Sequence, residues 1–113
     1  MSRIYKILPR GDWTAAQAAG RYLGSPVDAA DGFIHFSTAA QAPETAAKHF
    51  AGQPDLVVLE VEADDLGEAL RWEPSRGGQL FPHLYGPLDA EHVRAVTQAP
   101  LAADGAPRLG VLL

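Results

Sequence analysis

The chain has 113 residues, of which 47% are hydrophobic and 20% charged, values typical of one globular domain rather than a disordered chain. It has no cysteine, which excludes disulfides and thiolate metal sites and favours a reducing, cytoplasmic location. A net charge of −5 without a basic cluster argues against nucleic-acid binding, and no segment has the apolar length of a signal peptide or a membrane helix. We therefore expect a cytoplasmic protein that binds neither nucleic acid nor membrane, and the sequence identifies no protein partner.

The first third of the chain predicts two strands with a helix between them. Residues 3–8 alternate in polarity and are rich in Ile and Tyr, as strands are. Asp12 is placed to cap the helix that follows, and Gly20 is placed to end it. Residues 25–32 have the composition of a turn, and residues 33–37 predict the second strand.

The middle of the chain predicts a helix and the clearest strand. Thr38 and Gln41 have the spacing of a capping box, so residues 38–42 should form a turn that leads into a helix over 43–50. Residues 55–62 are apolar on both faces for most of their length, which predicts a strand covered on both sides.

The last third predicts mostly strands. Residues 70–73 and 80–86 should be extended, 88–92 should form one helical turn, and 93–99 should form the final strand. Two helices among several strands predict an α+β fold, with an antiparallel or mixed sheet, as a single compact domain over residues 1–113.

Two apolar segments each contain one histidine: "DGFIHFST" (31–38) and "LFPHLYGPL" (80–88). Because side chains alternate along a strand, each segment presents an aromatic ring, an imidazole and a hydroxyl on one face. The two stripes are Phe33, His35 and Ser37, and Phe81, His83 and Tyr85. Such a stripe suits a ligand cleft, because imidazole transfers protons near neutral pH and hydroxyls orient a ligand.

We predict that His35 and His83 face a common cleft, with Ser37 and Tyr85 beside them. The structural alternative is that each histidine only satisfies a buried carbonyl. If His35 faces a cleft and Phe36 faces the core, His35→Ala should destabilise the protein less than Phe36→Ala.

Other side chains allow a functional and a structural interpretation. Lys6 either reaches an anionic ligand or points outward from an exposed sheet face, and Arg76 before two glycines either contacts a phosphate or belongs to a mobile turn. Glu73 is expected to be solvated and Trp72 to be in the core. A metal site would need a third ligand beside the two stripe histidines, and no paired spacing supplies one, so no metal is expected. The other two histidines, His49 and His92, are expected on helix surfaces.

The segments "IYKILPRGDW", "DGFIHFST", "LVVLEVE", "LRWE" and "LFPHLYGPL", in this order, resemble the domain-of-unknown-function 952 family of small, mostly bacterial proteins. The resemblance implies an ADP-ribosyltransferase-like fold, with a split antiparallel or mixed sheet, a few short helices and a cleft for a nicotinamide dinucleotide. It places the first cleft motif at Lys6 and the second at His35 with Ser37 and Thr38. The third motif, where such folds often carry a glutamate, falls near His83.

Three functions are compatible with these features. The first is a transferase or hydrolase that binds NAD or ADP-ribose, with His35 and His83 as the catalytic pair. The other proposed ligand contacts are Lys6, Ser37, Thr38, Arg76 and Tyr85. The second is a non-catalytic module that binds a small anionic metabolite, and the third is a structural domain whose histidines only satisfy the core. We expect no certain cofactor, with NAD or ADP-ribose as the candidate ligand.

Overall fold

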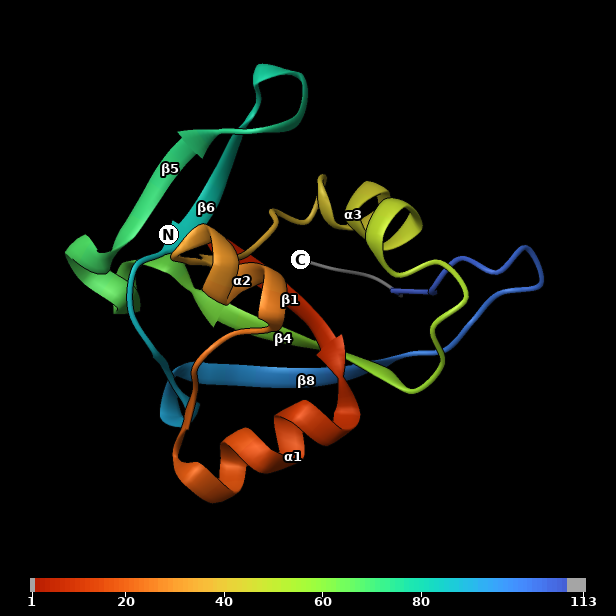
Figure 1. Ribbon diagram of the computed structural model, residues 1–113, viewed down its shortest axis with the longest axis horizontal. Coiled ribbons are helices and arrows are strands. Elements are labelled where there is room, and N and C mark those ends of the chain that lie inside the picture. The colour runs from red at the N-terminus through yellow and green to blue at the C-terminus, as the bar shows by residue number, and fades with distance from the viewer. Residues whose placement is uncertain (1, 110–113) are drawn as a thin grey trace.

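The computed structural model describes residues 2–109, with the exception of the side chain of Arg76, and contains two three-stranded sheets and a two-stranded ribbon (Figure 1). The first sheet has the order β1-β4-β8, the second has the order β3-β6-β5, and β2 pairs with β7. Every strand pair is antiparallel. The strands are β1 (Arg3–Pro9), β2 (Arg21–Tyr22), β3 (Ile34–His35), β4 (Leu56–Glu62), β5 (Leu70–Pro74), β6 (Leu80–Leu84), β7 (Leu88–Asp89) and β8 (Val93–Ala99).

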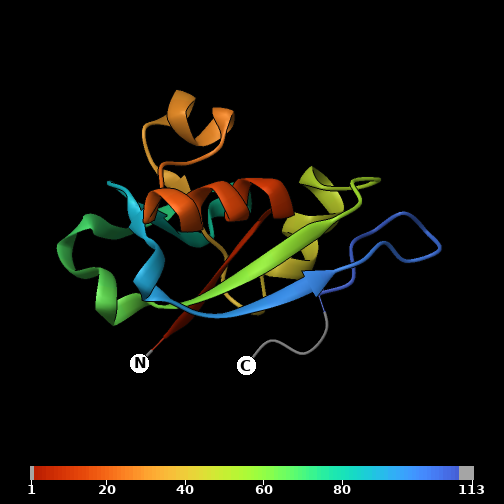
Figure 2. The same cartoon turned by 90° about the horizontal axis from the view of Figure 1, so that it is seen from below.

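Three α-helices and three 3-10 segments connect these strands. The α-helices are α1 (Arg10–Ala19), α2 (Pro26–Asp31) and α3 (Ala42–His49), and the 3-10 segments are η1 (Ala63–Ala69), η2 (Arg76–Gly78) and η3 (Ala90–His92). Figures 1 and 2 both show α2 and α3 well apart from each other, with α1 packed along the first sheet. The α+β class expected from the sequence is confirmed. No helix among residues 2–109 is long and apolar enough to cross a membrane.

The strand β4 is buried on both faces because it separates two apolar clusters. On one side Val57, Leu59 and Val61 join a cluster that includes Trp13 of α1 and Phe36. On the other side Leu56 and Val58 pack with Tyr5, Ile7 and the alanines of α3, Ala42 and Ala46. The apolar run of this segment, without alternation, is the pattern that such a two-sided position requires.

The two three-stranded sheets meet at one bridge between Tyr5 and Ser37. The Tyr5 N–H donates to the Ser37 carbonyl over 2.8 Å, and the Ser37 N–H donates to the Tyr5 carbonyl over 2.9 Å. In the described part of the chain no strand pairs with this side of β1 after Tyr5. Because backbone groups alternate between the two sides of a strand, the N–H and C=O of Ile7 point the same way as those of Tyr5, toward this open edge.

Two local predictions near the N-terminus are wrong. Helix α1 begins at Arg10 with Pro9 as its N-cap residue, so Asp12 lies in the first turn instead of capping it. The segment expected to be only a turn contains the helix α2, because Ser25 and Asp28 form a capping box around a proline at the helix start. The end of α1 is as expected, with Gly20 in the left-handed conformation at φ 85°.

The chain after residue 32 departs from expectation at three places. The predicted strand over 33–37 is regular only at β3 and then continues as the isolated bridge of Ser37. The predicted helical turn at 88–92 is a 3-10 turn only at η3, because β7 pairs with β2 before it. Trp72 is 41% exposed rather than part of the core, since it lies on the edge strand β5.

The burial of Phe36 leads to the first prediction. Phe36 is 2% exposed inside the core cluster, so Phe36→Ala should lower the free energy of unfolding by about 3–5 kcal/mol. His35, whose side chain is 34% exposed, should lose less, about 1–3 kcal/mol for the lost hydrogen bond to a buried group. Denaturant unfolding of both variants measures which one loses more unfolding free energy, and Trp72→Ala serves as the control at an exposed aromatic residue. An equal or larger loss at His35 would assign this histidine a primarily structural role.

Candidate functional site

A cavity of about 660 Å³ lies along the open edge of β1, where the two sheets separate after the Tyr5–Ser37 bridge. Its floor is the β1 segment from Tyr5 to Pro9, and its walls come from α2, α3, β3 and β6. The two stripe histidines, His35 and His83, both line it. The structure thus brings the two histidines to one cavity together with Ser37, whereas Tyr85 does not line it. The volume is in the range typical of small-molecule sites.

The carboxylate of Asp28, which is 1% exposed, connects the elements around this cavity. Its Oδ1 and Oδ2 accept from the Lys6 ammonium over 3.2 and 2.9 Å, and Oδ2 also accepts from the Ser25 N–H over 2.9 Å. Its Oδ1 further accepts from the His35 N–H over 3.2 Å and contacts the His35 Nδ1 at 2.5 Å. One carboxylate thus joins β1, α2 and β3, and Gly24 permits this packing, since a Cβ there would lie 2.8 Å from the Cβ of Asp28.

The protonation of this group follows from its partners. Burial alone would raise the pKa of the Asp28 carboxyl, but the hydrogen bond from His35, the charge of Lys6 and the N–H of Ser25 outweigh it, so this pKa lies well below its ordinary value. Burial lowers the pKa of the Lys6 ammonium, and the charge and hydrogen bonds of Asp28 oppose that shift. Lys6 and Asp28 therefore form a buried ion pair.

His35 lies between two carboxylates. Its Nδ1 faces Asp28, and its Nε2 lies 2.9 Å from Oδ2 of Asp31 on the outer end of α2. Each ring nitrogen of His35 therefore has a carboxylate oxygen as its neighbour. These two contacts occupy the imidazole, although its ring lines the cavity.

His83 contacts a carboxylate through its Nδ1. Its Nδ1 lies 2.8 Å from Oε1 of Glu73, and the Tyr85 hydroxyl donates to the same oxygen over 2.7 Å. The hydrogen bond from Tyr85, and after it the one from His83, lowers the pKa of Glu73. The hydrogen bond to Glu73 in turn raises the pKa of Tyr85. His83 is 4% exposed, and its Nε2 has no hydrogen bond within the described residues. The carboxylate fixes the proton on Nδ1, which leaves the Nε2 lone pair directed away from Glu73.

Aromatic contacts hold the two imidazoles near each other. The ring of Phe33 stacks on that of His83 with a centroid distance of 4.0 Å and lies 4.6 Å from that of His35. The two imidazole centroids are 5.6 Å apart. Residues from β3 and β6 meet here because these strands pair in a register that sets His35 opposite His83.

The other residues that the sequence singled out are distributed around the site. Lys6 and Ser37 line the cavity, but Lys6 is paired with Asp28, and the Ser37 hydroxyl lies 3.0 Å from that of Thr45. Thr38 forms the predicted capping box with Gln41, since each backbone N–H donates to the other side chain, over 3.0 and 3.2 Å. Tyr85 is 38% exposed and contacts Glu73 rather than the cavity. The side chain of Arg76 lies outside the described part of the structure, so its role stays a prediction.

Sequence reasoning missed three carboxylates of the site. Asp28 and Asp31 lie in a segment that was expected to be a turn. The spacing of Ser25 and Asp28 is a capping-box signal, which would have placed Asp28 in a helix. Glu73, expected to be solvated, is positioned by the β5–β6 pairing, whose register no local pattern predicts. Lys6 is buried, with 6% of its surface exposed, so the expectation of an outward-facing lysine is wrong.

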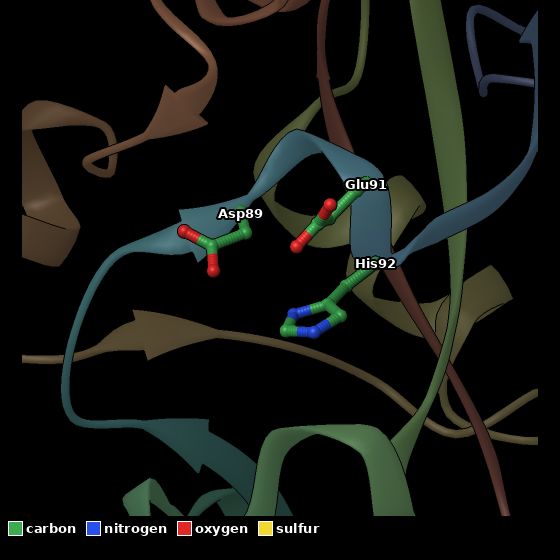
Figure 3. Close-up of side chains that lie close together, drawn as sticks. All are labelled: Asp89, Glu91 and His92. Atoms are coloured by element: carbon green, nitrogen blue, oxygen red, sulfur yellow. The ribbon is translucent and has the colours of Figure 1, made fainter.

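A second group of polar side chains lies at the β7–η3 junction and does not line the cavity (Figure 3). Potential ligand atoms of Asp89, Glu91 and His92 all lie within 4.8 Å of one another. Figure 3 shows the three side chains turned toward the same space. Two carboxylates and an imidazole are donors that suit divalent transition ions.

These features define a small α+β protein with a histidine-lined cavity between two sheets. The chain belongs to the family described as Protein of unknown function (DUF952), whose model matches residues 7–96. The resemblance seen in the sequence is thereby confirmed for the family, while its ADP-ribosyltransferase-like part stays a prediction. No curated protein matches the chain.

Solved structures of one bacterial protein are similar to this chain. The crystal structure of protein CC0527 from Caulobacter crescentus is 58% identical, with a TM-score of 0.92 over 94% of this chain and 93% of that one. A double-mutant form of that protein is 57% identical with the same coverage and TM-score. Its solution NMR structure is 59% identical, with a TM-score of 0.87 over 97% of this chain and 95% of that one.

The buried ion pair leads to the second prediction. Lys6→Met leaves the Asp28 carboxylate buried without its cation and should lower the free energy of unfolding by about 3–5 kcal/mol. The double variant Lys6→Met/Asp28→Asn removes both charges and should recover part of that loss. Denaturant unfolding measures both. If Lys6→Met alone left stability unchanged, Lys6 would be free to contact a ligand and the structural role assigned to it would be wrong.

The third prediction concerns acid stability. The folded-state pKa of Asp28 lies below that of an ordinary aspartate, about 3.9, so its stabilisation is complete above that value. As the pH falls below about 4, the unfolded chain takes up this proton before the folded one, and the free energy of unfolding decreases. The double variant Lys6→Met/Asp28→Asn should show a smaller decrease between about pH 5 and pH 2.5. Asp55→Asn, at a carboxylate that is 67% exposed, serves as the control and should follow the wild type.

Proposed function

We propose that this protein binds NAD, or an ADP-ribosyl compound related to it, in the cavity and acts on the bond between nicotinamide and ribose. The observation that carries the proposal is the state of His83. Its Nδ1 is held by Glu73, its Nε2 has no hydrogen bond among the described residues, and it lines the cavity beside His35. An imidazole oriented by a carboxylate, with its second nitrogen free, is the usual form of a general base.

The open edge of β1 supports recognition of an amide. The N–H and C=O of Ile7 point toward the cavity that this residue lines, without a strand partner on that side in the described chain. A donor and an acceptor side by side match the complementary pair of a carboxamide group, such as that of nicotinamide. An edge strand inside a cavity therefore supplies a recognition element that needs no particular side chain.

The charge of the lining favours the cationic end of such a ligand. Asp12, Asp28 and Asp31 line the cavity, and Asp28 is paired with Lys6. Asp12 and Asp31 are therefore the carboxylates that no lysine or arginine among the described lining residues compensates. The pyridinium of NAD carries a positive charge, and loss of nicotinamide passes through an oxocarbenium-like state that nearby carboxylates stabilise. The same pairing weakens the case for a module that binds a small anion through Lys6.

The proposed step is displacement of nicotinamide by water or by an acceptor hydroxyl. The oxygen of this nucleophile forms a bond to the anomeric carbon of the ribose and loses its proton to Nε2 of His83. The bond from that carbon to nitrogen breaks, and its electron pair neutralises the pyridinium, which leaves as nicotinamide. Glu73 holds the imidazole in orientation and stabilises the positive charge that forms on it, and Tyr85 orients Glu73.

The fourth prediction tests binding and chemistry separately. NAD at about ten times its dissociation constant should add ~1.4 kcal/mol to folding stability, which raises the melting temperature by about 5 °C. His83→Ala and His35→Ala should reduce this shift. Glu73→Gln should keep most of the melting shift. It should lower the rate of nicotinamide release, measured by chromatography, by about 10²-fold or more, because it removes the carboxylate from His83. Glu68→Gln, at an exposed residue of η1, is the matched control.

Two results would contradict the proposal. One is the absence of any melting shift or amide chemical-shift change with millimolar NAD and ADP-ribose. The other is an unchanged shift in both histidine variants, which would place the ligand outside this cavity and favour the structural interpretation of the two stripes.

A further inference from the structure

We infer that His49 contacts the anionic part of the ligand and thereby sets its orientation in the cavity. This inference rests on the proposed function and adds to it a residue on α3, outside both histidine stripes. It also narrows the ligand to a class: a molecule in which a cationic, hydroxyl-rich end is joined to an anionic diphosphate, as in NAD.

The first observation is the unequal charge of the two helical walls. The α2 wall contributes the carboxylates of Asp28 and Asp31 to the cavity. On the other wall, the described lining residues of α3 and the turn after it are Thr45, His49, Phe50 and Gln53, and none of these carries a carboxylate. These two sets of lining residues belong to helices that Figures 1 and 2 show apart from each other.

The second observation is that the His49 imidazole is available. His49 is exposed, and its ring takes part in no hydrogen bond, ion pair or ring contact among the described residues. The neighbouring charges of α3 are different in this respect: Lys48 lies 3.2 Å from Glu44, and neither lines the cavity. His49 is therefore a free donor, and on protonation a cation, on the wall without carboxylates.

Together these observations predict the direction in which a dipolar ligand lies. Its phosphates would be repelled by the half-exposed carboxylate of Asp31, since the charge of Asp28 is compensated by Lys6, and they would meet a donor at His49. Its cationic end gains from Asp31 on the α2 wall. The ligand would then run from α2 to α3 across the open edge of β1, past the backbone groups of Ile7 and the Nε2 of His83. This direction places the bond between nicotinamide and ribose near the stripe histidines, where the proposed step requires it.

The experiment is a charge series at position 49 with two probes. NAD carries a diphosphate, and nicotinamide riboside carries the same cationic end without phosphate. Dissociation constants are measured by calorimetry for the wild type, His49→Lys, His49→Gln and His49→Glu. For NAD, His49→Gln should weaken binding about two- to fivefold, His49→Glu about tenfold, and His49→Lys should stay within about twofold of the wild type. For nicotinamide riboside all four proteins should bind alike.

Lys48→Gln is the matched control, because Lys48 directly precedes His49 in α3 but does not line the cavity. It should leave NAD binding within about twofold of the wild type. Equal NAD affinity across the series would overturn the inference, as would an equal loss for both probes, or an equal loss in Lys48→Gln and His49→Gln. If nicotinamide riboside binds and the NAD series is flat, only the role of His49 fails, whereas if neither probe binds the wild type, the proposed function fails with it.

Discussion

The buried carboxylate of Asp28 holds together the part of the molecule that contains the cavity. It receives hydrogen bonds from Lys6 of β1, from the N–H of Ser25 that starts α2, and from both the backbone and the ring of His35. A buried charge is stable only with such partners, so the burial of Asp28 depends on these segments lying together. The arrangement neutralises Lys6 and immobilises His35, which makes both residues part of the framework around the cavity.

The two histidine stripes therefore differ in what they can do, although they look alike in sequence. His35 has a carboxylate at each nitrogen, whereas His83 has a carboxylate at one nitrogen and, among residues 2–109, no hydrogen bond at the other. Phe33 lies against both rings. In the proposed function the first imidazole stabilises the wall of the site and the second exchanges a proton with the ligand.

The cavity lies where the two sheets, joined in the described part of the chain by the Tyr5–Ser37 bridge alone, separate from each other. After Tyr5 pairs with Ser37, β1 continues along its other partner, β4, while β3 and β6 turn away from it. The exposed backbone edge, the acidic α2 wall and the α3 wall with His49 all result from this separation.

Local pattern was sufficient for much of the fold. The apolar run of β4, the glycine that ends α1 and the Thr38–Gln41 cap are properties of neighbouring residues. Alternation indicated which face of its strand each histidine occupies, but the pairing of β3 with β6 brings His35 and His83 to one cavity. Their carboxylate partners could not be read in this way. Lys6 and Asp28 are 22 positions apart, and Glu73 reaches His83 only through the register of β5 with β6. Such contacts depend on which strands pair and in what register, and these are properties of the whole chain. This long-range pairing therefore determined which carboxylates each histidine contacts.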